Sequence, residues 1–512
     1  MLSNWNFKEK GISFLFFFFL LSFYSVSQIK QESRYENFLS KDESGFEVVS
    51  DGPQGLFFIR NAFSESTHLI EIQYVDSAFK MQWNGFVQIK EGVSLIGKKS
   101  NDQFLFLLFK YNNVQNKDLL LYKIYKGNGD YLIVPVKNFV RFYPVNFQIT
   151  KSAILVGGYF NQVPLVLFID PDSGTSRVLP GLFNEMGELN QILIHDDGTF
   201  DVLIRSRNYY KQQTIWVKSY SEDGFLNYQF TLDPGEKKEL LFGRSIMGKN
   251  NLRIVAGVYS RRRSEFSRGL FMATIDSQGT QQIKYFNYSE LKNFFSYLKP
   301  RKQIRIHSRI DRRKIKEKNI IFNYRVLVHD LMYYKNQFIL LGEAFYPHYS
   351  SFDRNMYSGI FTPYLNAGSW VRDGRIFDGF YYTHAVVVGF NEAGDILWDN
   401  CFEMNDVKTF SLDQYVKVEM DNEKMKLIYL FQDQFQTKII KGNAVVEEKT
   451  GTPIQTRLES DIIPGKGKNG GNLEYWYGDY FYATGVQEIY NPTENQVPVH
   501  RKVFFVTKLK VK

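Results

Sequence analysis

Residues 147–179 read F-Q-I-T-K-S-A-I-L-V-G-G-Y-F-N-Q-V-P-L-V-L-F-I-D-P-D-S-G-T-S-R-V-L, and this stretch decides the fold. It holds four short apolar or alternating runs joined by tight loops, which predicts a four-stranded antiparallel meander. The run at 165–169 is apolar at every position, as is typical of a strand covered by neighbouring sheets on both faces. The same pattern returns around Ile254, Leu340 and Tyr482.

Repeats of this meander fill the chain. When the second strand of each unit is aligned, eight anchor positions emerge: Ile59, Leu108, Gly157, Arg205, Gly257, Gly342, Leu430 and Gly485. The first four intervals are 49, 49, 48 and 52 residues, close to the roughly 40–50 residues of a propeller blade. The expected fold class is therefore all-β, a β-propeller of four-stranded antiparallel blades. Eight blades are favoured and seven are possible, while a sandwich or a membrane barrel fits the doubly apolar strands less well.

The turns between third and fourth strands share one composition. Each begins with a polar residue or Gly and ends with Gly or Asp, which predicts hairpin turns with a positive φ at the glycine. They are at 127–130, 170–174, 221–224, 276–279 and 391–394. Asp170-x-Asp172 lacks the further ligands of a calcium loop. We therefore expect no metal site.

The last unit is one strand short. After residues 503–509 the sequence has no further turn or strand, whereas residues 34–39 have no place in the first unit. We predict that part of residues 30–40 completes the last blade and closes the ring, because closure removes open sheet edges.

The first 27 residues have the pattern of a secretory signal peptide. Lys8 and Lys10 precede an apolar run of about a dozen residues, and a small-x-small site precedes Gln28. We expect an exported protein whose single propeller domain comprises residues 28–512, located in the periplasm or at the outer membrane, or alternatively at the cell surface. With Cys401 as its one cysteine, the chain is outside the disulfide-rich secreted class.

The two longest intervals, 85 and 88 residues, indicate insertions. The first, 288–327, is predicted to contain a helix at 289–298 that Pro300 stops, followed by a basic segment at 299–318. That segment holds ten basic residues against Asp311 and Glu317, a net +8 in a chain of net +9. Such a concentration of charge indicates an anionic partner, although a solvated loop is the other interpretation.

The second insertion, 346–383, is rich in aromatic residues with Gly, Asn, Asp and Ser between them. We expect an ordered aromatic loop. Aromatic residues next to arginine are enriched at protein interfaces, and the alternative is a loop that packs its own small core.

Both insertions are predicted to leave the same face of the disc. In a four-stranded blade the connection after strand two and the connection after strand four lie on one side, and binding usually resides on such loops. The partner-binding candidates on this face are Arg261, Arg262, Arg263, Arg305, Arg309, Arg312, Arg313, Lys314, Tyr357, Tyr364, Trp370 and Phe380.

No catalytic constellation stands out. The seven histidines do not form a metal-ligand spacing, and no nucleophile elbow, phosphate-binding loop or dinucleotide fingerprint is present. Glu343 is the one carboxylate kept as a catalytic candidate. We expect no cofactor, no nucleic-acid partner and no enzymatic activity, with a lyase or glycoside hydrolase in the central channel as the less favoured reading.

The pattern Leu155-Val-Gly-Gly-Tyr-Phe, Phe168-Ile-Asp and Ser173-Gly, together with the Phe-rich leader before Gln28, resembles exported propellers of Bacteroidota. The resemblance covers about residues 45–512. It implies a subunit of an outer-membrane assembly, such as the periplasmic plug protein of the type 9 secretion translocon. The expected function is thus a non-enzymatic propeller that docks on an outer-membrane protein through the face of the two insertions. The alternative is a propeller that binds glycans or lipid phosphates with that face.

Overall fold

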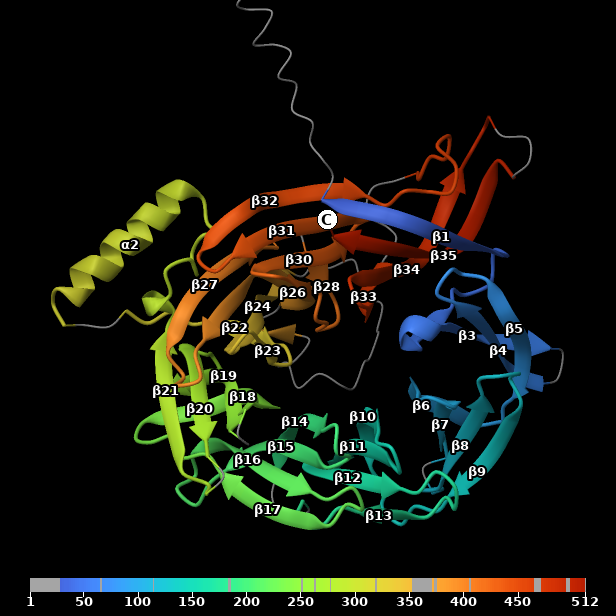
Figure 1. Cartoon of the computed structure of the whole chain (residues 1–512), viewed down its shortest axis with the longest axis horizontal. Helices are drawn as coiled ribbons and strands as arrows, with labels where there is room; N and C mark the ends of the chain where they lie inside the picture. The colour runs from blue at the N-terminus through green and yellow to red at the C-terminus, as the bar shows by residue number, and fades with distance from the viewer. Residues whose placement is uncertain are drawn as a thin grey trace, which may run out of the picture.

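A computed structural model of the chain describes residues 28–511, except 65–66, 114, 183–185, 250–251, 262–263, 277, 318–319, 352–370, 373–374, 405–406, 465–470 and 494–497. Eight antiparallel sheets are arranged in a ring around a central axis (Figure 1). The eight-bladed propeller expected from the repeats is confirmed, and every anchor position lies in the second strand of its blade. The expected signal peptide, residues 1–27, lies outside the described residues.

Blades 1 to 4 each contain four consecutive strands, with the first strand nearest the central axis (Figure 1). In chain order they are β2 (Glu47–Ser50), β3 (Gly55–Ser64), β4 (Thr67–Asp76) and β5 (Met81–Gln88); β6 (Val93–Ser100), β7 (Phe104–Tyr111), β8 (Leu119–Tyr125) and β9 (Tyr131–Val136); β10 (Tyr143–Ile149), β11 (Ile154–Phe160), β12 (Val163–Ile169) and β13 (Ser176–Val178); β14 (Gly187–Ile194), β15 (Phe200–Arg207), β16 (Gln213–Tyr220) and β17 (Leu226–Thr231). A short 3-10 helix, η1 (Gly52–Gln54), connects β2 to β3.

Blades 5 to 8 follow the same order, with additions in blade 6. They are β18 (Lys238–Met247), β19 (Arg253–Arg261), β20 (Gly269–Ile275) and β21 (Gln281–Asn287); β22 (Arg325–Val328), β24 (Gln337–Ser351), β26 (Arg375–Phe390) and β27 (Ile396–Glu403); β29 (Lys417–Asp421), β30 (Lys424–Phe431), β31 (Gln434–Lys441) and β32 (Ala444–Pro453); β33 (Gly471–Tyr477), β34 (Tyr480–Tyr490), β35 (His500–Val511) and β1 (Ile29–Leu39). The short β23 (Met332–Tyr334) pairs with β24, and β25 (Val371–Arg372) and β28 (Lys408–Thr409) pair with β26.

The hydrophobic core lies between neighbouring blades. Leu165, Val166 and Leu167 on β12 are all at most 1% exposed, because alternate side chains point into two different interfaces. This is the physical reason that the middle strands are apolar at every position.

The N-terminal strand closes the ring as predicted. β1 pairs antiparallel with β35 as the outermost strand of blade 8, for example Tyr35 opposite Val506. Ile29 and Leu509 lie in one buried cluster. The two ends of the described chain are thus hydrogen-bonded to each other.

The hairpin turns also agree with expectation. Gly174 has φ +70°, and a Cβ at this position would lie 2.2 Å from the carbonyl oxygen of Pro135 in the neighbouring blade. The turn therefore needs glycine both for its conformation and for close packing.

The first insertion differs from the prediction. The helix expected at 289–298 is absent; after η3 (Tyr288–Glu290) the chain is irregular, and the α-helix α2 (Pro300–Lys314) lies within the basic segment. Pro300 begins the helix at its first turn, where proline's missing N–H and fixed φ are favourable. The apolar residues that suggested a helix are buried between blades 5 and 6 instead: Leu291, Phe294 and Phe295.

The second insertion is partly strand rather than loop. β24 and β26 extend beyond the usual blade length and pair up to Ser351 and Arg375. Tyr346 faces Tyr381 and Tyr349 faces Phe377 across the ladder, and aromatic cross-strand pairs of this kind stabilise a hairpin. Residues 352–370 of this insertion lie outside the described residues.

Candidate functional site

The first insertion packs against β26 at His384, the residue that follows the second insertion. Tyr297 of the first insertion stacks on His384 of β26, with ring centroids 4.0 Å apart and planes 8° apart. Tyr324 bonds through its hydroxyl to that of Tyr297, at 3.1 Å, and through its backbone to Ser267 in the β19–β20 connection. The first insertion therefore lies against His384, just after the second insertion, and against the β19–β20 connection.

A buried carboxylate holds the segment that leads into α2. Asp399 on β27 is 3% exposed and accepts hydrogen bonds from the backbone N–H of Lys292 at 2.9 Å and of Asn293 at 2.6 Å. Burial raises the pKa of Asp399, and the hydrogen bonds from these two N–H groups oppose that rise. The base of the insertion is thus fixed to blade 6.

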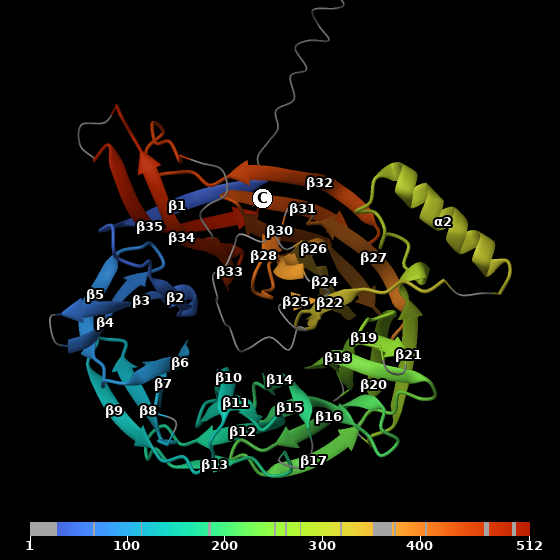
Figure 2. The same cartoon turned by 180° about the vertical axis from the view of Figure 1, so that it is seen from behind.

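The helix α2 lies against the ring with a single apolar stripe. Ile306 and Ile310 pack on the core cluster between blades 5 and 6, and the Gln303 amide donates to the carbonyl oxygens of Ser296 and Leu298. In both views the helix lies outside the ring (Figure 1, Figure 2). The opposite side of α2 is consequently free for solvent or a partner.

The exposed side of α2 is strongly basic. The helix carries seven basic residues against Asp311 alone: Arg301, Lys302, Arg305, Arg309, Arg312, Arg313 and Lys314. Within the described part of the chain, none of them lies within 4.0 Å of an acidic group. Ile304 is 66% exposed and Ile315 is 82% exposed beside these charges. We call the exposed side of α2, with Ile304 and Ile315, the basic helix surface.

The predicted partner-binding residues have different outcomes. Arg305, Arg309, Arg312, Arg313 and Lys314 are exposed on α2, and Arg261 is exposed at the end of β19. Arg262, Arg263, Tyr357, Tyr364 and Trp370 lie outside the described residues. Phe380 is a correction: it is 1% exposed and packs against Phe345 and Phe377, so its side chain cannot contact a partner.

The catalytic candidate Glu343 has a structural role. Its side chain is fully buried, and it accepts the backbone N–H of Val416 at 2.8 Å and of Tyr415 at 3.3 Å. The Nε2 atom of His329 lies 2.8 Å from its Oε1 atom. With both oxygens occupied, Glu343 holds the connection between blades 6 and 7.

His384 and Cys401 are both buried. Burial lowers the pKa of His384 to about 3 and raises the pKa of the Cys401 thiol to about 12. Among the described residues, no group of three or more His, Cys, Asp or Glu side chains could hold a metal ion. No helix in the described ranges is long and apolar enough to cross a membrane.

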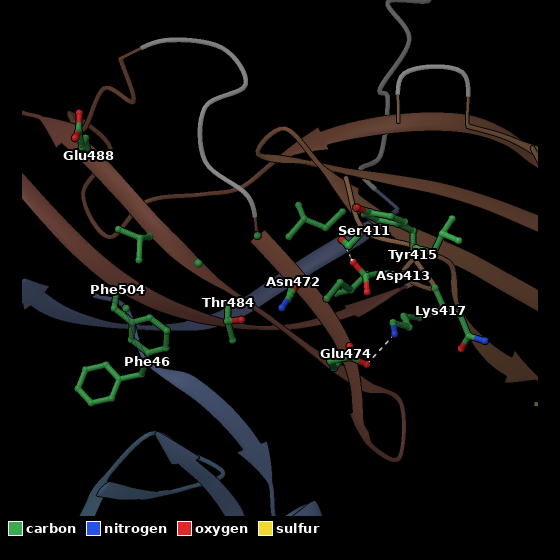
Figure 3. Close-up of a pocket in the computed structure, with 18 of the residues that line it drawn as sticks. Phe46, Ser411, Asp413, Tyr415, Lys417, Asn472, Glu474, Thr484, Glu488 and Phe504 are labelled. Carbon is green, nitrogen blue, oxygen red and sulfur yellow. Dashed lines mark hydrogen bonds and ion pairs between the residues drawn. The ribbon is translucent and has the colours of Figure 1, made fainter. Parts of the chain in front are cut away.

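A hollow of about 1080 Å³ lies on the same face, between blades 7 and 8. One wall is the connection at 411–415, the floor is formed by β33 and β34, and the far end is closed by Phe46 and Phe504 (Figure 3). Lys417 and Glu474 form an ion pair of 2.8 Å along its inner edge. We call this feature the blade 7–8 hollow.

Sequence reasoning did not find the blade 7–8 hollow. Its lining comes from residue 45 to residue 504, and ring closure brings these segments together. The only local signal is the paired glycines Gly471 and Gly485, which contribute no side chains to the floor.

No protein-family model matches the chain, and no curated protein sequence matches it either. Among solved structures it is similar to the polysaccharide lyase Uly1, with 10% identity over 92% of this chain and 100% of that one and a TM-score of 0.40. It is also similar to the WD40 domain of SCAP from fission yeast (7% identity, 94% and 97% coverage, TM-score 0.37). The β-propeller domain of the Trilobed protease from Pyrococcus furiosus is a further match (8% identity, 81% and 95% coverage, TM-score 0.35). At these identities the likeness concerns the propeller fold alone.

Proposed function

We propose that this chain is a non-enzymatic binding propeller that docks on an acidic surface of a partner protein through the basic helix surface. The observation that carries the proposal is the set of seven basic side chains on α2 without an acidic neighbour in the described structure. Concentrated charge of one sign steers and selects a partner of the opposite sign. Ile306, Ile310 and Gln303 hold the other side of α2 against the ring, so these charges point away from it.

The chemistry of α2 favours protein over membrane as the partner. An interfacial helix buries its apolar face in the lipid, but the apolar stripe of α2, Ile306 and Ile310, is already used against the core. Five of the seven cations are arginine, whose planar guanidinium pairs with carboxylates in a bidentate manner. Exposed Ile304 and Ile315 add apolar contacts of the kind found at protein interfaces.

A non-enzymatic role is favoured by the state of the candidate catalytic groups. Glu343 holds backbone amides, and buried Asp201 receives bonds from His195 and Arg253. Each is used to join parts of the ring. Export, and an outer-membrane complex as the site of docking, remain part of this proposal and rest on the leader pattern and the stated resemblance.

The experiment is affinity capture from detergent-solubilised membranes, comparing the wild type with the triple variant Arg305→Glu, Arg309→Glu, Arg312→Glu. We expect the variant to bind its captured protein partner at least about tenfold more weakly. Wild-type binding should also weaken between 50 and 300 mM salt, because exposed charges are screened (the Debye length is about 8 Å at 0.15 M).

A matched control changes the same net charge on the opposite face. Lys80, Lys151 and Lys424 lie at turns on the side away from α2, and Lys→Glu at all three should leave capture unchanged. Equal capture by the α2 variant and the control variant would show that α2 is not the docking surface. Loss of capture in both would show only nonspecific charge attraction and would also overturn the proposal.

A further inference from the structure

The blade 7–8 hollow has a wall whose shape is set by buried groups. The side chains of Ser411 and Asp413 line the hollow (Figure 3). The backbone of this connection is fixed by Glu343 at Tyr415 and Val416, and by the hydroxyl of buried Tyr382, which donates to the carbonyl of Asp413 at 2.7 Å. Gln414 donates to the carbonyl of Val328 at 3.1 Å. A wall held in this manner is preorganised, which is what a binding site requires.

Several polar side chains in the hollow lack a partner within the described residues. Asn472 and Glu488 are exposed; Thr484 lies on the floor between Asn472 and Phe504, and Glu488 lies beyond Phe504 (Figure 3). No hydrogen bond or ion pair joins the side chain of any of the three to another described group. An amide, a carboxylate and a hydroxyl together offer both donors and acceptors.

The two lysines of the lining are already engaged by protein groups. Lys417 is paired with Glu474, and Lys502 donates to the carbonyl oxygens of Lys41 and Glu43, at 3.1 and 2.7 Å. No lysine of the lining is therefore left to bind an anion. The remaining carboxylates, on Asp413 and Glu488, are acceptors suited to hydroxyl hydrogens.

We propose that the blade 7–8 hollow binds an uncharged oligosaccharide, independently of docking through α2. A chain of sugar rings presents many hydroxyls that both donate and accept, and apolar ring faces that pack on an aromatic side chain such as the half-buried Tyr415. The volume of about 1080 Å³ slightly exceeds the usual range for ligand pockets, about 300–1,000 Å³. It suits several sugar rings rather than one.

The test is calorimetric titration of the purified mature chain with a panel of tetrasaccharides. The uncharged members are built from glucose, mannose, galactose or xylose, and the charged members are a glucosamine and a uronic acid oligosaccharide. We expect saturable binding of at least one uncharged member. Asn472→Ala and Glu488→Gln should each weaken that binding about tenfold, since each removes a hydrogen-bonding group that the sugar would use.

The control variant is Glu222→Gln, a partly exposed carboxylate on a turn of the opposite face, which should bind as the wild type does. The α2 triple variant should also retain sugar binding, so that failure of one proposal is distinguishable from failure of the other. The proposal is overturned if no uncharged member saturates, if only the charged members bind, or if the two hollow variants bind as the wild type does.

Discussion

The connections that precede blade 6 and blade 7 are each held by a buried carboxylate that accepts two backbone N–H groups. One connection leads to a protruding helix, and the other lines a hollow. Asp399 accepts the consecutive N–H groups of Lys292 and Asn293, and Glu343 accepts those of Tyr415 and Val416. The first connection continues into the protruding α2, and the second forms a wall of the blade 7–8 hollow. A buried carboxylate that accepts hydrogen bonds from two adjacent backbone amides thus fixes the position of a connection. It does not determine whether that connection forms a protrusion or a wall of a hollow.

The largest expected effect comes from a substitution at Glu343. Glu343→Ala leaves two buried amides and His329 without their acceptor, and we expect a loss of about 3–5 kcal/mol in the free energy of unfolding. Sugar binding in the blade 7–8 hollow should be lost with it, while capture through α2 remains. Urea denaturation and the calorimetric titration measure the two effects.

A conservative control separates positioning from stability. Glu343→Gln keeps one oxygen acceptor and the size of the side chain, so it should lose less stability and retain part of the sugar binding. Unchanged sugar binding in a folded Glu343→Ala protein would show that this carboxylate does not position the wall.

The fold could be predicted because each blade repeats a local pattern, and counting strands was enough to assign residues 30–40 to the last blade. The helix could not be placed, because proline is compatible with both the end and the first turn of a helix. The helix begins at Pro300 rather than ending there, because the segment before it buries Phe294 and Phe295 in the core between blades 5 and 6. Phe380 was misread because its strand continues further than the loop composition suggested.

The candidate sites show the same limit. The charge on α2 is visible in the sequence because its residues are contiguous. The blade 7–8 hollow is invisible there, since Phe46, Asp413 and Asn472 come together only when the ring is closed. Contact between distant segments has no local signature, so only the structure could reveal it.

In the connection that leads to α2, the change equivalent to Glu343→Ala is Asp399→Ala. It removes the two hydrogen bonds from the backbone N–H groups of Lys292 and Asn293 and keeps the one from the Asn293 side chain to the carbonyl of residue 399, so we expect a loss of about 2–3 kcal/mol. Hydrogen exchange should increase at residues 291–299, and capture through α2 should weaken while sugar binding stays unchanged. Loss of both activities would show that the two connections are coupled rather than independent.

A smaller effect distinguishes the two sides of α2. Ile306 packs on the core, so Ile306→Ala should cost about 1–2 kcal/mol, whereas Ile304→Ala should change stability by less than about 0.5 kcal/mol. The exposed Ile304 should matter instead for docking, with a loss of affinity of less than about tenfold. Thermal unfolding and affinity capture of both variants provide the measurements, and the reverse ranking in stability would contradict the orientation of the helix.

The smallest effect is a dependence of stability on pH that comes from Asp399. Burial raises the pKa of this carboxyl in the folded state, so between its unfolded value, about 3.9, and its raised value the folded protein binds more protons than the unfolded chain. Stability must then decrease as pH rises through that window. Asp399→Asn cannot titrate and lacks this contribution, so the stability difference between wild type and variant should shrink as pH increases through the window and stay constant above it. Denaturation midpoints of both proteins from pH 3.5 to 7 test the direction of this pH dependence. A stability difference that grows with pH would mean that the amides of Lys292 and Asn293 stabilise the carboxylate more than burial disfavours it. The ionised Asp399 side chain would then be a net source of stability at neutral pH.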